Sequence, residues 1–152
     1  NPFPKKITWE FDDNNYGNID WLTKIKLDTL TSKKTWHKNL NFHITKELKY
    51  NENDSLVEVN VDKKAFNFPR KSGKILANYS NNEFRIKTSC IESFKIMISP
   101  EMINLKKKVK VYINDKLYFN HKLKYNKDFM VKSFEKTKDR IQIWINEIVL
   151  EI

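Results

Sequence analysis

Hydrophobic and polar residues alternate along most of this chain. The segment KITWEF places Ile7, Trp9 and Phe11 on one face, and Thr8 and Glu10 fall on the other. A period of two residues is typical of a β-strand that buries one of its faces. We therefore expect a strand here, with its three hydrophobic side chains directed into a core.

The same alternation recurs in segments separated by turn-forming residues. These segments are IDWLTKIKL, NLNFHITKEL, SLVEVNVD, NEFRIKTS, SFKIMIS, VKVYI, LYFNHKL and residues 141–152. Their expected inward residues are Ile19, Trp21, Thr23, Ile25, Leu27, Leu40, Phe42, Ile44, Val57, Val59, Val61, Phe84, Ile86, Thr88, Phe94, Ile96, Ile98, Val109, Val111, Ile113, Ile141, Ile143 and Ile145. Asn114 and Asp115 predict a hairpin turn. Residues 62–80, which include Pro69, favour a loop.

No segment shows a helical period, so the pattern predicts about nine short strands without intervening helices. Such a chain is typical of an all-β fold, here an antiparallel β-sandwich, with a closed barrel as the alternative. The length of 152 residues predicts a single domain over residues 1–152. No internal repeat or linker divides it.

The chain contains no segment expected to cross or enter a membrane. No apolar run approaches the roughly 20 residues that span a bilayer, and the start NPFPKK has no hydrophobic signal core. Because Asn1 rather than Met begins the chain, we expect a processed or excised piece of a longer protein.

The net charge of +10 comes from lysine rather than arginine. Of 29 cationic residues only Arg70, Arg85 and Arg140 are arginines. Specific phosphate and base readers favour the planar guanidinium group, so we do not expect a nucleic-acid-binding protein. The run of lysines at 106–108 is interpreted as the solvated lip of a strand, where lysine discourages wrong pairing. Salt-sensitive polyanion binding is the competing hypothesis.

Several kinds of chemistry find no support in the sequence. Gly17 and Gly73 are the only glycines, so the chain has no phosphate-cradling loop, dinucleotide fingerprint or Gly-x-Ser-x-Gly elbow. Cys90 is the only cysteine, which excludes an intrachain disulfide and a thiolate metal cluster. We expect no cofactor and no enzymatic activity in this chain.

The histidines and the adjacent acidic residues do not show metal-ligand spacing either. His43 and His121 are expected at the surface, and together with His37 they form no zinc-binding pattern. Asp12 and Asp13 lie in an asparagine-rich turn and are interpreted as turn residues. A calcium ion held by that loop is the minor alternative.

The aromatic residues divide by the face on which alternation places them. Trp9 and Trp21 share a face with isoleucines and are expected in the core. Trp144 and Tyr112 are out of phase with the flanking isoleucines and valines, and Trp36 lies among polar residues. Trp36, Tyr112 and Trp144 are therefore the candidate ligand-binding residues, with packing beneath a loop or against a neighbouring domain as the other explanation.

Two parts of the chain resemble a known family. NPFPKKITWEF followed by NNYGNIDWLTKIKL, and later FRIKTSCIESFKIMISPEMINLKKKVKVYINDKLYF, are similar to the C-terminal β-sandwich domain of secreted bacterial α/β-hydrolases of the prolyl-oligopeptidase-like and esterase type. The resemblance covers about residues 1–27 and 83–150. The chain departs from the pattern at Asp115, where the family has glycine, and at Lys107 and Lys108.

The resemblance implies an immunoglobulin-like β-sandwich that serves as a non-catalytic accessory domain of an exported, secreted or periplasmic hydrolase. Its partner would be an upstream catalytic domain of the same polypeptide, on which it packs and whose substrate access it helps to shape. No catalytic residue is carried over, because those residues would precede Asn1. The alternative function is a carbohydrate-binding module that uses the exposed aromatic residues to bind polysaccharide.

Overall fold

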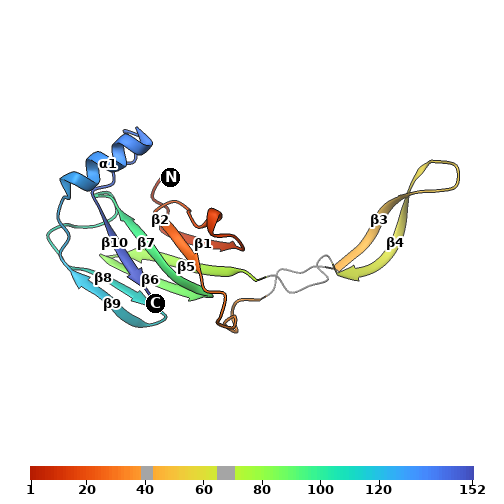
Figure 1. The fold of residues 1–152 in the computed structure, drawn as a ribbon, viewed down its shortest axis with the longest axis horizontal. Helices are drawn as coiled ribbons and strands as arrows, with labels where there is room; N and C mark the ends of the chain where they lie inside the picture. The colour runs from red at the N-terminus through yellow and green to blue at the C-terminus, as the bar shows by residue number, and fades with distance from the viewer. Residues whose placement is uncertain (39–42, 65–70) are drawn as a thin grey trace. The chain divides into compact units, whose positions relative to one another are not determined.

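A computed structural model of the chain describes residues 1–38, 43–64 and 71–152. The chain forms two compact units. The first consists of Asn1–His37 and Ser72–Ile152, and the second of Lys38–Lys71. Figure 1 shows the strands of both units.

The first unit contains two sheets and one helix. The five-stranded sheet has the order β1 (Lys6–Phe11), β5 (Gly73–Ser80), β6 (Glu83–Ser89), β8 (Val109–Ile113) and β9 (Lys116–His121). The three-stranded sheet has the order β10 (Asn146–Glu151), β7 (Ile91–Ile98) and β2 (Leu22–Leu27). Neighbouring strands are antiparallel except for β6 and β8, which are parallel. A short 3-10 helix, η1 (Asn14–Tyr16), precedes β2.

The two sheets pack as a sandwich around a hydrophobic core to which both contribute. Trp21 is fully buried at its centre, and its ring makes edge contacts with Tyr79 and Phe84 at centroid distances of 5.6 and 5.4 Å. The indole Nε1 of Trp21 donates a hydrogen bond of 2.7 Å to the carbonyl of Pro4. The only polar atom of the buried ring therefore has a hydrogen-bond partner. Trp9 is half-buried and packs against this core.

The prediction of an all-β sandwich is confirmed, with ten strands in the described residues. The inward residues of β8 illustrate why alternation worked, since Val109, Val111 and Ile113 are all fully buried. Asn114 and Asp115 form the predicted two-residue hairpin turn, with φ angles of 50° and 68°. The lysines at 106–108 are exposed before β8 begins, as expected for a solvated strand lip.

The prediction of a loop over residues 62–80 is wrong at both ends, because residues 62–64 belong to β4 (Leu56–Lys64) and residues 73–80 to β5. Residues 73–80 form β5, which lies between β1 and β6 and buries Ile75, Ala77 and Tyr79. The turn-forming residues that precede this strand concealed its alternation. The position of Pro69 lies outside the described residues.

The sequence interpretation also missed a helix, α1 (Lys127–Thr137). Asn126 caps its N-terminus by accepting a hydrogen bond of 3.1 Å from the backbone N–H of Phe129. Lys138 ends it in the left-handed conformation, with its N–H bonded to the carbonyl of Phe134. None of the helical residues is fully buried, so the hydrophobic period is weak and did not stand out.

The last segment before β10 is not a strand, contrary to the prediction that residues 141–145 alternate. Ile141 and Ile143 are 80% and 50% exposed, whereas Ile145 is fully buried. Trp144, which alternation placed outside, is only 6% exposed. Because this segment lacks regular strand geometry, a period of two residues does not indicate which side chains point into the core.

A register shift in β2 explains why Leu22, which alternation placed on the outer face, is buried. Trp21 and Leu22 are consecutive, and both are fully buried. Lys24 has a positive φ of 48°, and the pairing of β2 with β7 shifts between Thr23 and Lys26. The irregularity exchanges the two faces of the strand within a few residues.

The second unit is a two-stranded antiparallel hairpin of β3 (His43–Tyr50) and β4 (Leu56–Lys64). The predicted turn between them is confirmed, because Asn51 accepts hydrogen bonds of 2.9 and 3.0 Å on Oδ1 from the backbone N–H groups of Asn53 and Ser55. The expected inward residues Leu40 and Phe42 lie outside the described residues.

Candidate functional site

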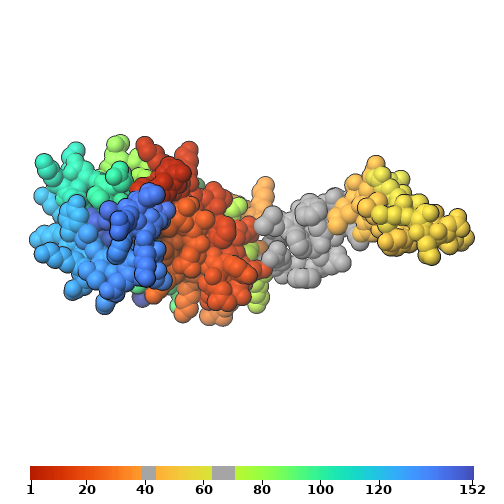
Figure 2. Space-filling model, turned by 90° about the horizontal axis from the view of Figure 1, so that it is seen from above, coloured from red at the N-terminus to blue at the C-terminus, as the bar shows by residue number. Residues whose placement is uncertain are grey.

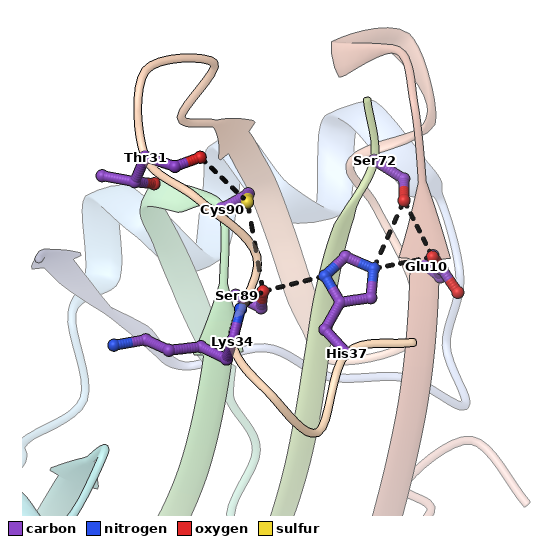
Figure 3. Close-up of polar contacts among 7 residues, drawn as sticks. All are labelled: Glu10, Thr31, Lys34, His37, Ser72, Ser89 and Cys90. Atoms are coloured by element: carbon purple, nitrogen blue, oxygen red, sulfur yellow. Dashed lines mark hydrogen bonds and ion pairs between the residues drawn. The ribbon is translucent and has the colours of Figure 1, made fainter. Parts of the chain in front are cut away.

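A buried histidine organises a cluster of polar side chains at one end of the five-stranded sheet (Figure 3). His37 is 3% exposed. Its Nε2 lies 2.7 Å from Oε1 of Glu10, and its Nδ1 lies 2.8 Å from Oγ of Ser89. Oγ of Ser72 donates to the same oxygen of Glu10 at 2.8 Å and lies 3.3 Å from Nε2 of His37.

The sheet register brings the members of this cluster together. Glu10 of β1 pairs with Lys74 of β5, and Lys74 pairs with Ser89 of β6. Residues opposite one another in an antiparallel pair share a face of the sheet. Glu10 and Ser89 therefore lie on the outer face at the same level, where the segment after β2 places His37 over them.

Ser89, His37 and Glu10 are hydrogen-bonded in the order serine, histidine, acid, which is the order of a catalytic triad. With Nε2–H donating to the carboxylate of Glu10, Nδ1 accepts the hydroxyl proton of Ser89, a tautomer assigned from the hydrogen-bond pattern. Nucleophilic catalysis also requires that the serine oxygen can reach a substrate. Ser89 is only 1% exposed, and its Oγ already accepts a hydrogen bond of 3.0 Å from the backbone N–H of Lys34.

The cluster thus joins the segment that carries Lys34 and His37 to the outer face of the sheet. The chain leaves the first unit at His37 and returns to it at Ser72. The 3.3 Å approach of their side chains holds these two chain positions together. We refer to Glu10, His37, Ser72 and Ser89 as the His37 clasp.

The carboxyl group of Glu10 is held in its ionised form. Burial acts to raise its pKa, but the hydrogen bonds from His37 and Ser72, together with the positive charge of Lys74, outweigh this effect. The pKa of Glu10 therefore lies below its ordinary value. This is the behaviour of a structural hydrogen-bond acceptor rather than of a general acid.

A second feature is an apolar groove between α1 and the segment that precedes β10. Its volume is about 590 Å³. The groove is lined by Met130, Val131, Ser133, Phe134, Glu135, Asp139, Arg140, Gln142, Ile143 and Trp144. Figure 2 shows the C-terminal part of the chain, in blue, at the surface of the first unit beside N-terminal segments in red and orange. We call this feature the α1 groove.

Several large apolar side chains that line the α1 groove are exposed. Val131, Phe134 and Ile143 are 57%, 48% and 50% exposed. Large side chains gathered in this way mark an interaction surface more often than isolated ones do. The sequence analysis missed the groove, although Asn126 followed by a hydrophobic cluster is a helix-start signal that locates α1.

The three predicted ligand-binding residues lie in different settings. Trp144 lines the α1 groove, and its ring packs edge-on against Phe3 at 5.4 Å. Trp36 is half-buried beside the His37 clasp, with its ring 6.2 Å from that of His37. Tyr112 is half-buried on the outer face of the five-stranded sheet, and the guanidinium of Arg85 lies 4.5 Å from its ring centre. The structure does not bring the three into one platform.

The remaining polar candidates do not form a site in the described part of the chain. His121 is exposed at the end of β9, as expected, and the side chain of His43 lies outside the described residues. Asp13 caps η1 by accepting a hydrogen bond of 2.8 Å from the N–H of Asn15. Among the described side chains, no group of three or more His, Cys, Asp or Glu is arranged to hold a metal ion.

No helix in the described residues is long and apolar enough to cross a membrane. Comparison with known proteins adds no relative, since no protein-family model, curated protein or solved structure matches this chain.

Proposed function

We propose that this chain is a non-catalytic accessory β-sandwich domain of an exported hydrolase, and that its α1 groove packs on the catalytic domain of the same polypeptide. The observation that carries the proposal is the concentration of exposed apolar side chains around the groove. The rim also carries Glu135, Asp139 and Arg140. A mixed apolar and polar face of this kind resembles interdomain surfaces within one chain.

The His37 clasp supports the non-catalytic part of the proposal. Ser89 has the hydroxyl closest to a ring nitrogen of His37, yet this hydroxyl is buried and its oxygen already accepts a hydrogen bond from the backbone N–H of Lys34. A substrate carbonyl would have to displace this segment to reach Ser89. The isolated chain is therefore expected to show no esterase or peptidase turnover.

The turnover experiment compares the purified chain with a Ser89→Ala variant on activated esters and peptide amides. Equal background rates for both proteins agree with the proposal. Hydrolysis that survives repurification and disappears in Ser89→Ala would show instead that the clasp is an active site.

The docking experiment uses the complete open reading frame from which the chain derives. An α/β-hydrolase domain is expected there, and its binding to this chain in trans is measured by calorimetry. Phe134→Glu places a charge in the groove and is expected to weaken binding by about tenfold or more. Val149→Glu is the matched control, because Val149 is 59% exposed on β10 and does not line the groove.

Two results contradict the proposal: a reading frame that encodes no hydrolase domain, or docking that Phe134→Glu leaves intact.

Carbohydrate binding remains the alternative, and the structure limits where it can occur. Arg85 covers one face of the Tyr112 ring, and Trp144 presents only a small part of its ring to the α1 groove. Affinity electrophoresis in polysaccharide gels tests this function directly. Retardation that is lost in Tyr112→Ala and kept in Phe134→Glu would favour the sheet face over the groove.

A further inference from the structure

The two sheets of the sandwich differ in charge. The strands of the three-stranded sheet carry three cationic and three acidic residues, namely Lys24, Lys26, Lys95, Glu92, Glu147 and Glu151. The strands of the five-stranded sheet carry six cationic and two acidic residues, namely Lys6, Lys74, Arg85, Lys87, Lys110, Lys116, Glu10 and Glu83. Among these strands the excess of positive charge is therefore confined to one sheet.

Ion pairs neutralise the three-stranded sheet further. Nζ of Lys26 lies 3.5 Å from Oε2 of Glu92, and Nζ of Lys95 lies 3.1 Å from Oε1 of Glu147. Two of the three lysines on these strands thus have an acidic partner close by. An anion that approaches this sheet would have to compete with the glutamates.

The five-stranded sheet has no such balance. Both of its acidic residues already have partners, because Glu83 pairs with Arg85 at 3.2 Å and Glu10 belongs to the His37 clasp. Within the described residues no ion pair involves three further lysines on the outer face of this sheet, Lys6, Lys87 and Lys110. Their charges are available to an anionic partner.

The strand register arranges polar, cationic and aromatic side chains in one row across this face. Lys6 pairs with Asn78, Asn78 pairs with Arg85, and Arg85 pairs with Tyr112, so the row crosses β1, β5, β6 and β8. Paired residues lie on the same face, and adjacent strands are about 4.8 Å apart. The row therefore presents its side chains at regular intervals along a line perpendicular to the strands.

Two more cations flank this row. Lys87 follows Arg85 by two positions on β6, and Lys110 precedes Tyr112 by two positions on β8. Residues two positions apart on a strand share a face. Positive charge therefore surrounds the middle of the row on both sides.

The guanidinium of Arg85 is held in place at the middle of the row. Its Cζ lies 4.5 Å from the centre of the Tyr112 ring, and its Nη2 lies 3.2 Å from Oε2 of Glu83. The side chain of Arg85 is nevertheless 54% exposed, and a guanidinium has five N–H donors, of which the bond to Glu83 uses one. An exposed guanidinium of fixed orientation suits a carboxylate, which it binds through two parallel hydrogen bonds.

We propose that the outer face of the five-stranded sheet binds an acidic polysaccharide, with Arg85 receiving a carboxylate and Tyr112 contacting a sugar ring. Because the row crosses four strands, its occupant is an extended polymer with repeated charges rather than a single small anion. A single-stranded nucleic acid would use successive aromatic platforms, whereas this row has one aromatic residue. The inference does not depend on the proposed accessory function.

The test measures binding of oligogalacturonate to the full chain by calorimetry at physiological salt. The same oligomer with methyl-esterified carboxylates is the matched neutral ligand. The wild-type chain is expected to bind the charged oligomer about tenfold more tightly than the ester, and Arg85→Gln is expected to weaken binding of the charged oligomer by about tenfold.

A pair of double variants separates a site on this face from the effect of net charge. Lys6→Gln with Lys87→Gln removes two charges from the face, and Lys127→Gln with Lys132→Gln removes two from α1, which packs against β10 of the other sheet. All four lysines are exposed, so both variants are expected to fold. The first should weaken binding about fivefold. The second should change it by less than about twofold, because charges beyond a Debye length of about 8 Å are screened.

Absence of binding, equal affinity for the esterified oligomer, or wild-type affinity in Arg85→Gln would overturn the inference. Equal losses in the two lysine double variants would do so as well, because they would show an effect of net charge alone. A single-stranded oligonucleotide that binds more tightly than oligogalacturonate and loses its affinity in Arg85→Gln would assign the face to nucleic acid instead.

Discussion

Replacing His37 by alanine tests whether the clasp is structural. The substitution removes a hydrogen bond of 2.7 Å to the ionised carboxylate of Glu10 and one of 2.8 Å to Ser89. A bond to a charged partner contributes about 1.5–3 kcal/mol, and a neutral bond about 0.5–1.5 kcal/mol. Since His37 is buried and the Glu10 side chain is only 14% exposed, water can replace little of the lost hydrogen bonding.

We expect His37→Ala to lower the free energy of unfolding by about 3 kcal/mol. For a domain of ~100 residues this corresponds to a fall in Tm of about 12 °C or more. Urea and thermal unfolding followed by tryptophan fluorescence measure the loss, with buried Trp21 reporting on the core. Lys34→Ala is the control, because Lys34 contacts Ser89 through its backbone N–H, and a change within ~0.5 kcal/mol is expected.

The same cluster predicts a dependence on pH. The depressed pKa of Glu10 means that its stabilisation is complete above the unfolded-state pKa of about 4.3 and is lost as the pH falls through the lower folded-state pKa. The difference in free energy of unfolding between wild type and Glu10→Gln should therefore become smaller as the pH falls. A difference that grows in acid, or a loss below ~1 kcal/mol for His37→Ala, would refute the structural role of the clasp.

Three further substitutions test the packing of the sandwich, each by its change in the free energy of urea unfolding. Trp144→Ala removes a buried ring that packs on Phe3 and should lower the free energy of unfolding by about 3 kcal/mol. A decrease below ~1 kcal/mol would mean that the ring is not part of the core. Gly17→Ala would place a Cβ atom 2.1 Å from the carbonyl oxygen of Ile25, and we expect a loss of about 2 kcal/mol or more, so wild-type stability would contradict the close approach. Asp115→Gly relieves a φ of 68° in the hairpin turn and should add about 0.5 kcal/mol, whereas a decrease would show that the aspartate side chain stabilises the turn.

Local sequence information was sufficient where a strand is regular and one of its faces is buried. Val109, Val111 and Ile113 are all buried as predicted, and the turn at Asn114 and Asp115 lies where its residues indicate. In such segments the direction of each side chain follows from its position in the strand. The class of fold could therefore be predicted without knowledge of any contact.

Prediction failed where the backbone departs from that regularity. The irregular segment before β10 buries Trp144 and exposes Ile141, the reverse of what alternation indicated. Helix α1 buries no residue completely, so its period carried little signal. In both cases the direction of a side chain depends on what other parts of the chain pack against it.

The sequence by itself determined that this protein is an all-β sandwich with a solvated lysine-rich surface, because alternation is a local property that each strand expresses independently. Only the tertiary structure decided which polar residues meet. Glu10, His37 and Ser89 are separated by 27 and 52 positions along the chain. The register of β1, β5 and β6 aligns Glu10 with Ser89, and the segment after β2 places His37 against both.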